Sequence, residues 1–271
     1  MVERFIYTED VTGSSPVSPT KQNYMKITIL YEDKDVVVIN KPANLIVHPD
    51  GHPPKKKYKT VVDWILEKYP KIKNVGEPMI LEDGTKILRP GIVHRIDKDT
   101  TGALIIAKNK ESFEFLKEQF KNRKVHKVYQ LFVYGNLKED RGMIDRQIGR
   151  SPNDFRKWSA QRGARGELRE AITYFKVLKR KGDFTFLEAM PKTGRTHQIR
   201  VHFKAINHPL VHDDLYAERF NLEKKNQLGF KRIALHAREL EITLPSDKLL
   251  NIVAPYPKDF ADAVKKFGIK Q

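Results

Sequence analysis

The segment RPGIVHRIDKDTTGALIIAKN, residues 89–109, joins a charged turn to an apolar run of strand length. Gly91 and Gly102 flank the charged part, and the apolar run ALIIA follows it directly. A short apolar run bounded by turn residues is typical of a buried strand, so Asp97 is expected on a loop at the end of a sheet. Rigid scaffolds usually present catalytic groups on such loops. Taken alone, the segment is equally consistent with a turn aspartate that pairs with a neighbouring cation.

Alternating and apolar runs along the rest of the chain predict more strands than helices. The segment 25–42 contains two such runs around the polar turn EDKD, which predicts a hairpin. Further strands are expected at 127–135, 171–180, 183–191, 232–237 and 239–245. Helices are expected at 60–69, 111–123, 195–207 and 257–268, while 136–168 is polar and basic and includes SPNDFRKWSAQRGARGELR, which shows little periodicity, so no strand or helix is assigned there. Because strands and helices do not alternate regularly, the pattern favours an α+β domain built on a largely antiparallel, mixed central sheet flanked by helices and loops.

The first 24 residues differ in character from the rest of the chain. They contain TGSSPVSPT, which is rich in Ser, Thr, Pro and Gly and has no periodic apolar face. No basic start followed by an apolar stretch is present, as a secretory signal would require. We therefore interpret residues 1–24 as a disordered extension, or as residues wrongly assigned ahead of a true start at Met25, and residues 25–271 as one domain.

The composition limits the classes of function. The chain has 271 residues and no cysteine, which excludes disulfides, Cys-ligated zinc, iron–sulfur clusters and thiol nucleophiles. No apolar run approaches the roughly 18 residues of a membrane span. A formal net charge of +17 favours a polyanionic partner, because Lys and Arg contacts to phosphate supply most non-specific affinity for nucleic acid.

Two further segments carry residues that could take part in binding or catalysis. In PKTGRTHQIRVH, residues 191–202, a helix is expected to begin after the glycine, with Arg195 at its entry and Arg200 a turn later. Such arginines suit a phosphate, or a carboxylate that needs a fixed partner, although a solvated basic helix face would look similar. In HKVYQLFVYG, residues 126–135, Tyr129 is either a packing residue or an aromatic platform for an extruded base.

Taken together, the segments resemble the RluA-type family of RNA pseudouridine synthases over about residues 26 to 245. The likeness is carried, in chain order, by ILYEDKDVVVINKPANLIVHP, HRIDKDTTG, KVYQLFVYG, TGRTHQIRVH, and HPLVHDDLYA with ALHA. HRIDKDTTG is similar to the family pattern HRLD followed by a TSG-like turn. The resemblance implies the pseudouridine synthase fold, with an active-site cleft across the sheet.

The resemblance also implies roles for individual residues. Asp97 would be the reactive carboxylate, acting as nucleophile at the anomeric carbon or as base on the sugar, and Arg200 would pair with it. Tyr129 would stack on the flipped uracil, Leu235 would help wall the pocket, and Arg95 would fill the space that the base leaves. The isomerisation needs no redox change and no group donor, so no cofactor and no metal are expected.

The implied partner is RNA, most often large-subunit ribosomal RNA and in some members transfer RNA. Many members carry a small RNA-binding domain before the catalytic one, and the 24 residues before Met25 are too short to form it. RNA is therefore expected to bind the basic surface of the catalytic domain itself. The expected RNA-binding residues are Arg95, Arg195, Lys55, Lys56, Lys57 and those of the loop 156–169. We expect a cytoplasmic protein that is monomeric and does not bind a membrane.

Two other functions fit parts of the sequence. His208, His212, Asp213 and Asp214 could hold the metal of a phosphohydrolase or nuclease, although adjacent His and Asp are weak evidence for a metal site. A non-catalytic RNA-binding or ribosome-assembly protein could also have kept the fold. Loss of activity with EDTA would favour the first, and inactivity on uridine-labelled RNA would favour the second.

Overall fold

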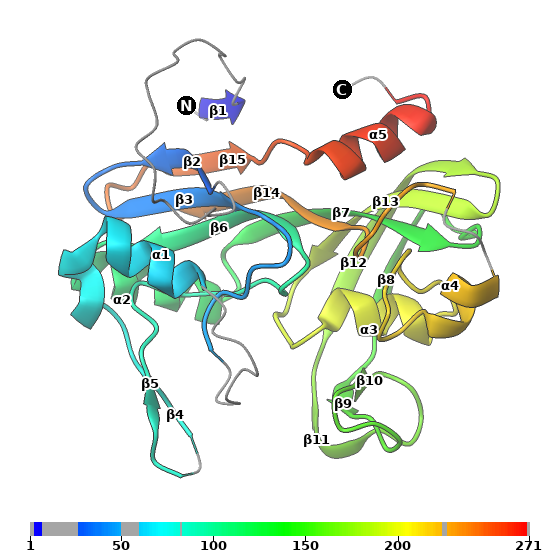
Figure 1. The fold of residues 1–271 in the computed structure, drawn as a ribbon, viewed down its shortest axis with the longest axis horizontal. Helices are drawn as coiled ribbons and strands as arrows, with labels where there is room; N and C mark the ends of the chain where they lie inside the picture. The colour runs from blue at the N-terminus through cyan, green and yellow to red at the C-terminus, as the bar shows by residue number, and fades with distance from the viewer. Residues whose placement is uncertain (1–2, 7–26, 50–59, 82, 224–226, 270–271) are drawn as a thin grey trace, which may run out of the picture.

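Figure 1 shows the computed structural model, which describes residues 3–6, 27–49, 60–81, 83–223 and 227–269. The strands are β1 (Glu3–Ile6), β2 (Thr28–Glu32), β3 (Val36–Lys41), β4 (Met79–Ile80), β5 (Lys86–Ile87), β6 (Thr101–Ala107), β7 (His126–Tyr134), β8 (Arg141–Asp145), β9 (Ile148–Arg150), β10 (Trp158–Ser159), β11 (Arg165–Arg169), β12 (Ile172–Lys181), β13 (Phe184–Pro191), β14 (Leu235–Thr243) and β15 (Leu249–Val253). The helices are α1 (Val61–Lys68), the 3₁₀ helix η1 (Pro70–Asn74), α2 (Lys110–Lys121), α3 (Gln198–Ala205), α4 (Glu218–Glu223) and α5 (Lys258–Lys266).

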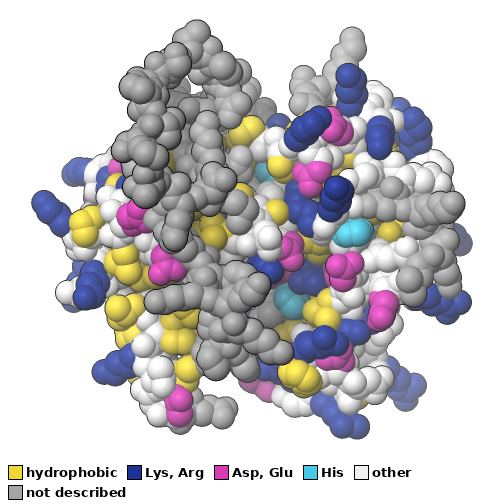
Figure 2. Space-filling view, viewed as in Figure 1, with side chains coloured by type: hydrophobic (Ala, Val, Ile, Leu, Met, Phe, Trp, Pro, Cys, Tyr) yellow, Lys and Arg dark blue, Asp and Glu magenta, His cyan; other side chains and the backbone are white. Residues whose placement is uncertain are grey.

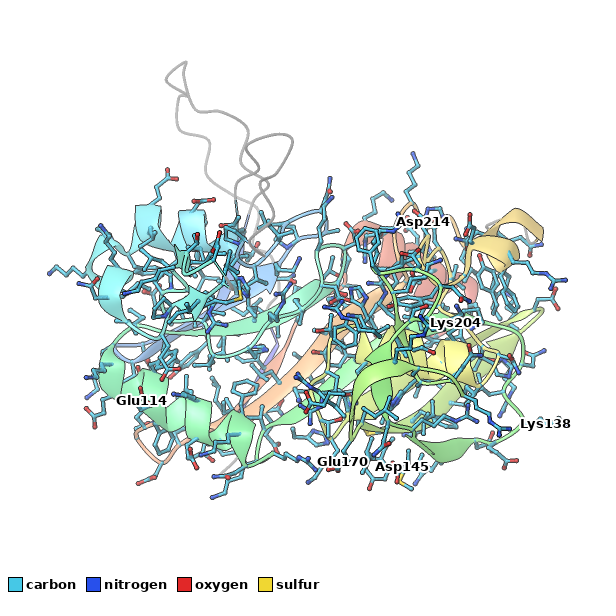
Figure 3. The ribbon with its side chains drawn as sticks, turned by 90° about the horizontal axis from the view of Figure 1, so that it is seen from below. Glu114, Lys138, Asp145, Glu170, Lys204 and Asp214 are labelled. Carbon is cyan, nitrogen blue, oxygen red and sulfur yellow. The ribbon has the colours of Figure 1, made fainter. Side chains whose placement is uncertain are left out.

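One large sheet runs through the molecule in the order β2-β3-β6-β14-β7-β13-β12-β8, with β15 paired to β14 and β1 paired to β15. The pairs β6–β14 and β1–β15 are parallel and the other pairs of this sheet are antiparallel. Seen from below, Glu114 of α2 and Lys138 mark opposite ends of the molecule (Figure 3). The predicted α+β class with a largely antiparallel, mixed sheet is confirmed.

Helices cover the β3–β6 end of this sheet on both faces. Alternate residues of these two strands point to opposite sides, so Val38 and Ile105 pack with Phe113 of α2, whereas Ile39 and Leu104 pack in the cluster that contains α1. Both strands are therefore buried on two faces, and they read as continuous apolar runs. The start of α1 is fixed by a capping box, in which Thr60 and Asp63 exchange hydrogen bonds as the sequence predicts.

Two sequence predictions about strands are wrong. The separate strands expected at 232–237 and 239–245 form the single strand β14, and a register shift between Ala237 and Glu239 marks a bulge where the apolar pattern breaks. The segment 136–168, in which the sequence analysis assigns no strand, contains β8, β9, β10 and part of β11. Every residue of β11 is exposed, so this strand has no apolar pattern to reveal it.

The prediction for the first 24 residues remains a prediction. Residues 7–26 lie outside the described ranges, while β1 is described and runs parallel to β15 with Glu3 opposite Leu250. Within the described ranges, no helix is both long enough and apolar enough to cross a membrane.

A close contact between β6 and β14 joins the two halves of the sheet. Gly102 pairs with Ala237 and Thr101 with His236 in the only parallel step along the main strand order of the described residues. A Cβ added to Gly102 would lie 2.2 Å from the carbonyl oxygen of Ala237, and the φ angle of Gly102 is +115°. Only glycine lets the two backbones approach this closely.

Gly102→Ala should therefore lower the free energy of unfolding by about 2 to 4 kcal/mol, through the clash and the strained φ angle. Urea denaturation followed by tryptophan fluorescence measures this. Gly194→Ala is the control, because Gly194 lacks a positive φ angle and an added Cβ would meet no atom within 4 Å. Equal stability of the two variants would contradict this account of the contact between β6 and β14.

Candidate active site

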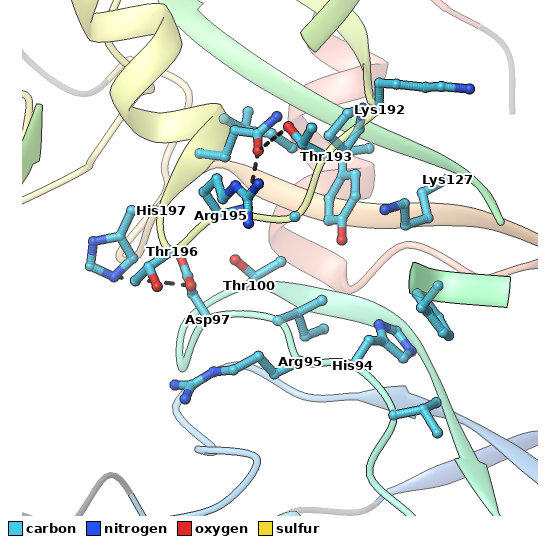
Figure 4. A pocket seen from close by; sticks show the side chains of 18 of the residues that line it. His94, Arg95, Asp97, Thr100, Lys127, Lys192, Thr193, Arg195, Thr196 and His197 are labelled. Atoms are coloured by element: carbon cyan, nitrogen blue, oxygen red, sulfur yellow. Dashed lines mark hydrogen bonds and ion pairs between the residues drawn. The ribbon is translucent and has the colours of Figure 1, made fainter. Parts of the chain in front are cut away.

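A cavity of about 640 Å³ opens beside the β6–β14 contact (Figure 4). It is lined by Asp97 from the turn before β6, Tyr129 from β7, Leu235 from β14 and Arg200 from α3. These elements are neighbours because β6, β14, β7 and β13 are consecutive in the sheet and α3 follows β13 in the chain. The structure thus brings together four residues that are widely separated in the sequence.

Arg200 bridges two carboxylates at the base of this cavity. Its Nη1 donates to Asp97 Oδ2 at 3.1 Å, and its Nε and Nη2 donate to Asp213 Oδ2 and Oδ1 at 2.8 and 2.9 Å. The Asp213 side chain is 0% exposed and that of Arg200 is 12% exposed, whereas the Asp97 side chain remains 24% exposed. The forked guanidinium is held by the fully buried acid and presents its remaining edge to the acid that faces the cavity.

Asp213 is the residue of this site that the sequence misplaced. The sequence grouped Asp213 with possible metal ligands. In the structure its carboxylate accepts hydrogen bonds from Arg200 and from the backbone NH groups of Leu215 and Tyr216. His208, from the same set, bonds through Nδ1 to the carbonyl of Tyr134. Among the residues that the structure describes, no three His, Asp or Glu side chains are arranged to hold a metal ion. A buried arginine that faces one carboxylate often has a second carboxylate as a partner. That expectation calls for an acidic residue beside Arg200 but does not identify Asp213 as that residue.

The surroundings of Asp97 keep it ionised. Burial alone would raise the pKa of Asp97, but the charges of His197 and Arg200, the hydrogen bond from Arg200 and the charge of Arg95 hold that pKa below its usual value. His197 Nε2 lies 4.0 Å from Asp97 Oδ1, whereas Arg200 bonds to the other oxygen, Oδ2. The carboxylate is therefore negative at neutral pH while one face stays open to the cavity.

His197 also connects the carboxylate to a second aromatic residue. Its Nδ1 lies 2.9 Å from the hydroxyl of Tyr216, which accepts the backbone NH of Trp158, and the Tyr216 ring lies 5.0 Å from the Arg200 guanidinium. Burial lowers the pKa of His197, although the charge of Asp97 acts in the opposite direction. Figure 4 shows His197 facing Asp97 at the edge of the cavity.

The loop before α3 differs from the prediction. The helix begins at Gln198, later than expected, and its cap residue His197 adopts a left-handed conformation with φ at 56°. Arg195 therefore lies in a loop and not at the helix entry. That loop is held by Gln198, whose Oε1 accepts the backbone NH of Arg195 and the hydroxyl of Thr193. The backbone turn at His197 aims this side chain at Asp97.

Tyr129 forms the aromatic wall of the cavity and remains neutral. Burial and the charge of Asp97 both raise the pKa of its phenol above the usual value. A phenol in this state can donate a hydrogen bond and offer a ring face, but it is a poor base at neutral pH. Leu235, 4% exposed, lies on the neighbouring strand β14, opposite Leu131 in the register, and provides an apolar surface.

Thr100 contributes an unpaired hydroxyl to the same cavity. The residue is 1% exposed, and its Oγ1 has no hydrogen-bond partner among the described residues. The next residue, Thr101, is equally buried but bonds to His236 Nδ1 at 2.8 Å. Buried polar atoms are rarely left unpaired, so the Thr100 hydroxyl is a candidate contact for a bound molecule.

Positive charge dominates the cavity walls. Nine Lys and Arg side chains line it, namely Arg89, Arg95, Lys117, Lys121, Arg123, Lys127, Lys192, Arg195 and Arg200. Among the described lining residues, Asp97 is the only carboxylate. Arg95 and Arg195 approach from opposite walls, with Asp97 between them (Figure 4). Lys55, Lys56 and Lys57 lie outside the described ranges, so their predicted role stays a prediction.

His94 has structural contacts and is not part of the ion cluster around Asp97. Its Nε2 accepts the backbone NH of Ile105 at 3.1 Å, and its ring stacks on Phe120 with centroids 4.6 Å apart. Burial and the charge of Lys127 lower the pKa of His94 to about 3, so the ring is neutral at physiological pH.

Such a cation-lined cavity suits an enzyme whose substrate is a nucleic acid. Residues 35–205 match the family model described as RNA pseudouridylate synthase. The chain belongs to this family, and it is an isomerase that acts on RNA. This confirms the resemblance found in the sequence and decides against the metal-dependent hydrolase.

Proteins that are similar to this chain carry the names of pseudouridine synthases. An uncharacterized RNA pseudouridine synthase of Synechocystis is 39% identical over 247 residues, which cover 90% of this chain and 70% of the relative. The ribosomal large subunit pseudouridine synthase D of Borreliella burgdorferi is 36% identical over 256 residues, covering 94% and 72%. Among solved structures, the human RNA pseudouridylate synthase domain containing 1 is 26% identical with a TM-score of 0.66, covering 88% of this chain and 87% of that one.

The lowered pKa of Asp97 predicts a pH-dependent contribution to stability. Because the pKa is lower in the folded than in the unfolded protein, the ionised carboxylate stabilises the fold above the unfolded value, near 3.8, and this contribution is lost as the pH falls through the folded value. The difference in free energy of unfolding between the wild type and Asp97→Asn should therefore shift in favour of the wild type from pH 3 to pH 5. Urea titrations at both pH values measure it, and a difference that grows in the opposite direction would contradict the assignment.

Proposed function

We propose that the chain converts specific uridines of large-subunit ribosomal RNA to pseudouridine, with Asp97 as the reactive carboxylate and with the uridine flipped out of the RNA. One observation carries the proposal. An ionised carboxylate, paired with Arg200, faces an aromatic and apolar wall inside a cavity whose rim is strongly basic. The names of several relatives, in Borreliella burgdorferi, Blochmanniella floridana and Xylella fastidiosa, specify the ribosomal large subunit.

The chemistry needs a negative oxygen next to the sugar. The bond between uracil nitrogen and the anomeric carbon breaks, the base rotates, and a bond from a uracil carbon to the same anomeric carbon forms, so atoms and electrons balance without a cofactor. Asp97 acts as nucleophile at the anomeric carbon or as base on the sugar, and either role requires the ionised form. Arg200 supports that form and is itself neutralised by Asp213.

The remaining cavity residues fit an extruded uridine. Tyr129 offers a neutral ring for stacking and Leu235 an apolar contact. The Thr100 hydroxyl can bond to a polar atom of the uridine, because it has no described partner in the protein. We expect Arg95, which is exposed and contacts His48 through Nη1 at 3.3 Å, to enter the gap that the base leaves.

RNA outside the cavity can bind the basic module formed by residues 141–170. Lys157, Trp158 and Lys204 line a smaller cavity of about 170 Å³, and the Arg150 guanidinium lies 4.2 Å from the Trp158 ring. Figure 3 shows Lys204 between Asp214 and Glu170 in the view from below, and Figure 2 shows Lys and Arg side chains spread over another face. An aromatic ring with neighbouring cations is a common platform for single-stranded RNA.

Deletion of this gene should remove pseudouridine from defined positions of large-subunit ribosomal RNA. Restoring the wild-type gene should restore them, whereas Asp97→Asn should not, because a neutral amide lowers the reaction rate by at least about a hundredfold. Pseudouridine mapping in ribosomal and transfer RNA from the same cells measures the outcome. Asp262→Asn, at an exposed position on α5, is the matched control and should restore the modification.

Purified Asp97→Asn should still fold and bind RNA, which separates lost chemistry from lost structure. Pseudouridine formed by Asp97→Asn would overturn the role of the carboxylate. Loss of pseudouridine from transfer RNA alone would overturn the proposed substrate.

Thr100→Val should lower kcat/KM by about tenfold without lowering stability, because the hydroxyl bonds to the uridine and to no described residue. Thr101→Val is the matched contrast, since its hydroxyl bonds to His236 and its loss should lower the unfolding temperature. Kinetics on labelled RNA and thermal unfolding of both variants measure the difference. A wild-type kcat/KM for folded Thr100→Val would show that the hydroxyl does not contact the substrate.

A further inference from the structure

The turn that carries Asp97 is held through its backbone by residues that do not line the cavity. The NH of Thr100 bonds to the carbonyl of Asp97 at 3.1 Å, which closes the turn, and the carbonyls of Lys98 and Asp99 accept hydrogen bonds from other parts of the chain. The Lys98 carbonyl accepts the buried Nζ of Lys41 at 2.9 Å. The Asp99 carbonyl accepts Nη1 of Arg232 at 3.1 Å. Each of these two carbonyls thus accepts a hydrogen bond from a cationic side chain elsewhere in the chain.

Arg232 lies just before β14 and connects three parts of the fold. Its Nη1 also donates to the carbonyl of Ile233 at 3.0 Å, so the guanidinium contacts the segment that leads into β14 as well as the turn. Its other edge forms a two-point ion pair with Asp259, with Nε to Oδ2 at 2.8 Å and Nη2 to Oδ1 at 2.9 Å. The Arg232 side chain is 10% exposed and the Asp259 side chain 29% exposed, so this pair is only partly screened by water.

Asp259 is itself fixed by the helix on which it lies. It stands in the first turn of α5, and its Oδ1 accepts the backbone NH of Phe260 at 2.8 Å. Phe260 is 0% exposed and packs with Phe132 and Phe186 in the core. The position of Asp259 is therefore fixed by its neighbour Phe260 in the core, and the ion pair with Asp259 in turn fixes the position of the Arg232 guanidinium.

We propose that Asp259 is a positioning residue for the isomerisation, which orients Arg232 so that the Asp99 carbonyl, and with it the Asp97 carboxylate, is held at the reacting sugar. The inference rests on the proposed role of Asp97. Arg200 fixes the carboxylate of Asp97, while the Asp259–Arg232 pair fixes the backbone that carries it. Neither Asp259 nor Arg232 lines the cavity, so neither contacts the RNA there.

Removal of the Asp259 charge would redirect Arg232. Asp97, Asp99 and Arg232 all interact electrostatically with the same buried Lys41 amine, so the turn already lies in the field of Arg232. A guanidinium released from Asp259 would be drawn to the turn's own carboxylates and away from the Asp99 carbonyl. A displacement of the carboxylate by about 1 Å is enough to slow a reaction by one to two orders of magnitude.

The test compares Asp259→Asn with Asp262→Asn. Asp262 lies one turn further along α5 and pairs with Lys258 at 3.0 Å, where the Asp262 and Lys258 side chains are 55% and 90% exposed. The substrate is tritiated-uridine RNA from cells that lack the gene, with enzyme in saturating excess, and RNA affinity is measured by filter binding. We expect the single-turnover rate of Asp259→Asn to fall by at least about tenfold with affinity unchanged, and Asp262→Asn to match the wild type.

Arg232→Lys provides a second variant, because it keeps the charge and loses the fork that reaches both Asp99 and Asp259. It should show the same slow chemistry with unchanged affinity, at a temperature where thermal unfolding shows each variant to be folded. A wild-type rate in either folded variant, or a loss that weaker RNA binding explains, would overturn the inference.

The same assay on Asp97→Asn separates this inference from the proposed function. An active Asp97→Asn overturns the role of the carboxylate itself. An inactive Asp97→Asn together with a fully active Asp259→Asn overturns only the positioning role.

Discussion

The site depends on keeping one carboxylate charged where water is partly excluded. Taking an ion out of water costs several kcal/mol even after relaxation, so Asp97 needs a nearby cation to stay ionised. Arg200 supplies it, but a guanidinium that is 12% exposed carries the same cost and needs compensation of its own. The fully buried Asp213 provides that with two hydrogen bonds. One ionised carboxylate in the cavity thus requires a chain of three ions, and the fold has to bring all three to one place.

A single parallel contact in the sheet brings together the elements that carry the cavity residues. A purely antiparallel sheet would place the turn before β6 away from the start of β14, whereas the parallel step at Gly102 and Ala237 sets both at the same edge. Tyr129 on β7 then lies beside β14, and α3 returns over the same edge after β13. The close approach that glycine allows is therefore a condition for the active site as well as for the sheet.

Local signals in the sequence predict most elements of this fold, and tertiary pairings explain the failures. The capping box at Thr60 and the strands with apolar runs are decided by neighbouring residues, so pattern alone locates them. The strand β11 is exposed along its whole length and has no such pattern. The bulge after Ala237 interrupts the alternation of β14, which makes one strand look like two.

The candidate site shows the same division between local and tertiary information. Asp97, Tyr129, Arg200 and Leu235 could be located through motifs, and the structure brings them to one cavity. The role of Asp213 could not, because adjacent His and Asp residues resemble metal ligands and the ion pair with Arg200 exists only after folding. The left-handed turn at His197, which aims that ring at Asp97, likewise has no sequence signal, since the residue is not a glycine.

The distribution of charge in the cavity also decides which part of an RNA can approach Asp97. Arg200, deep in the site, is neutralised by two carboxylates, while Lys121 and Lys117, with side chains 72% and 39% exposed, stand at the rim. A phosphate gains from the cations of the rim but is repelled by the negative charge of Asp97 further inside. The uncharged base and sugar suffer no such repulsion, and they gain from the neutral ring of Tyr129 and the apolar side chain of Leu235. The electrostatics therefore favour the proposed arrangement, in which the RNA backbone stays at the mouth of the cavity and one extruded nucleoside reaches Asp97.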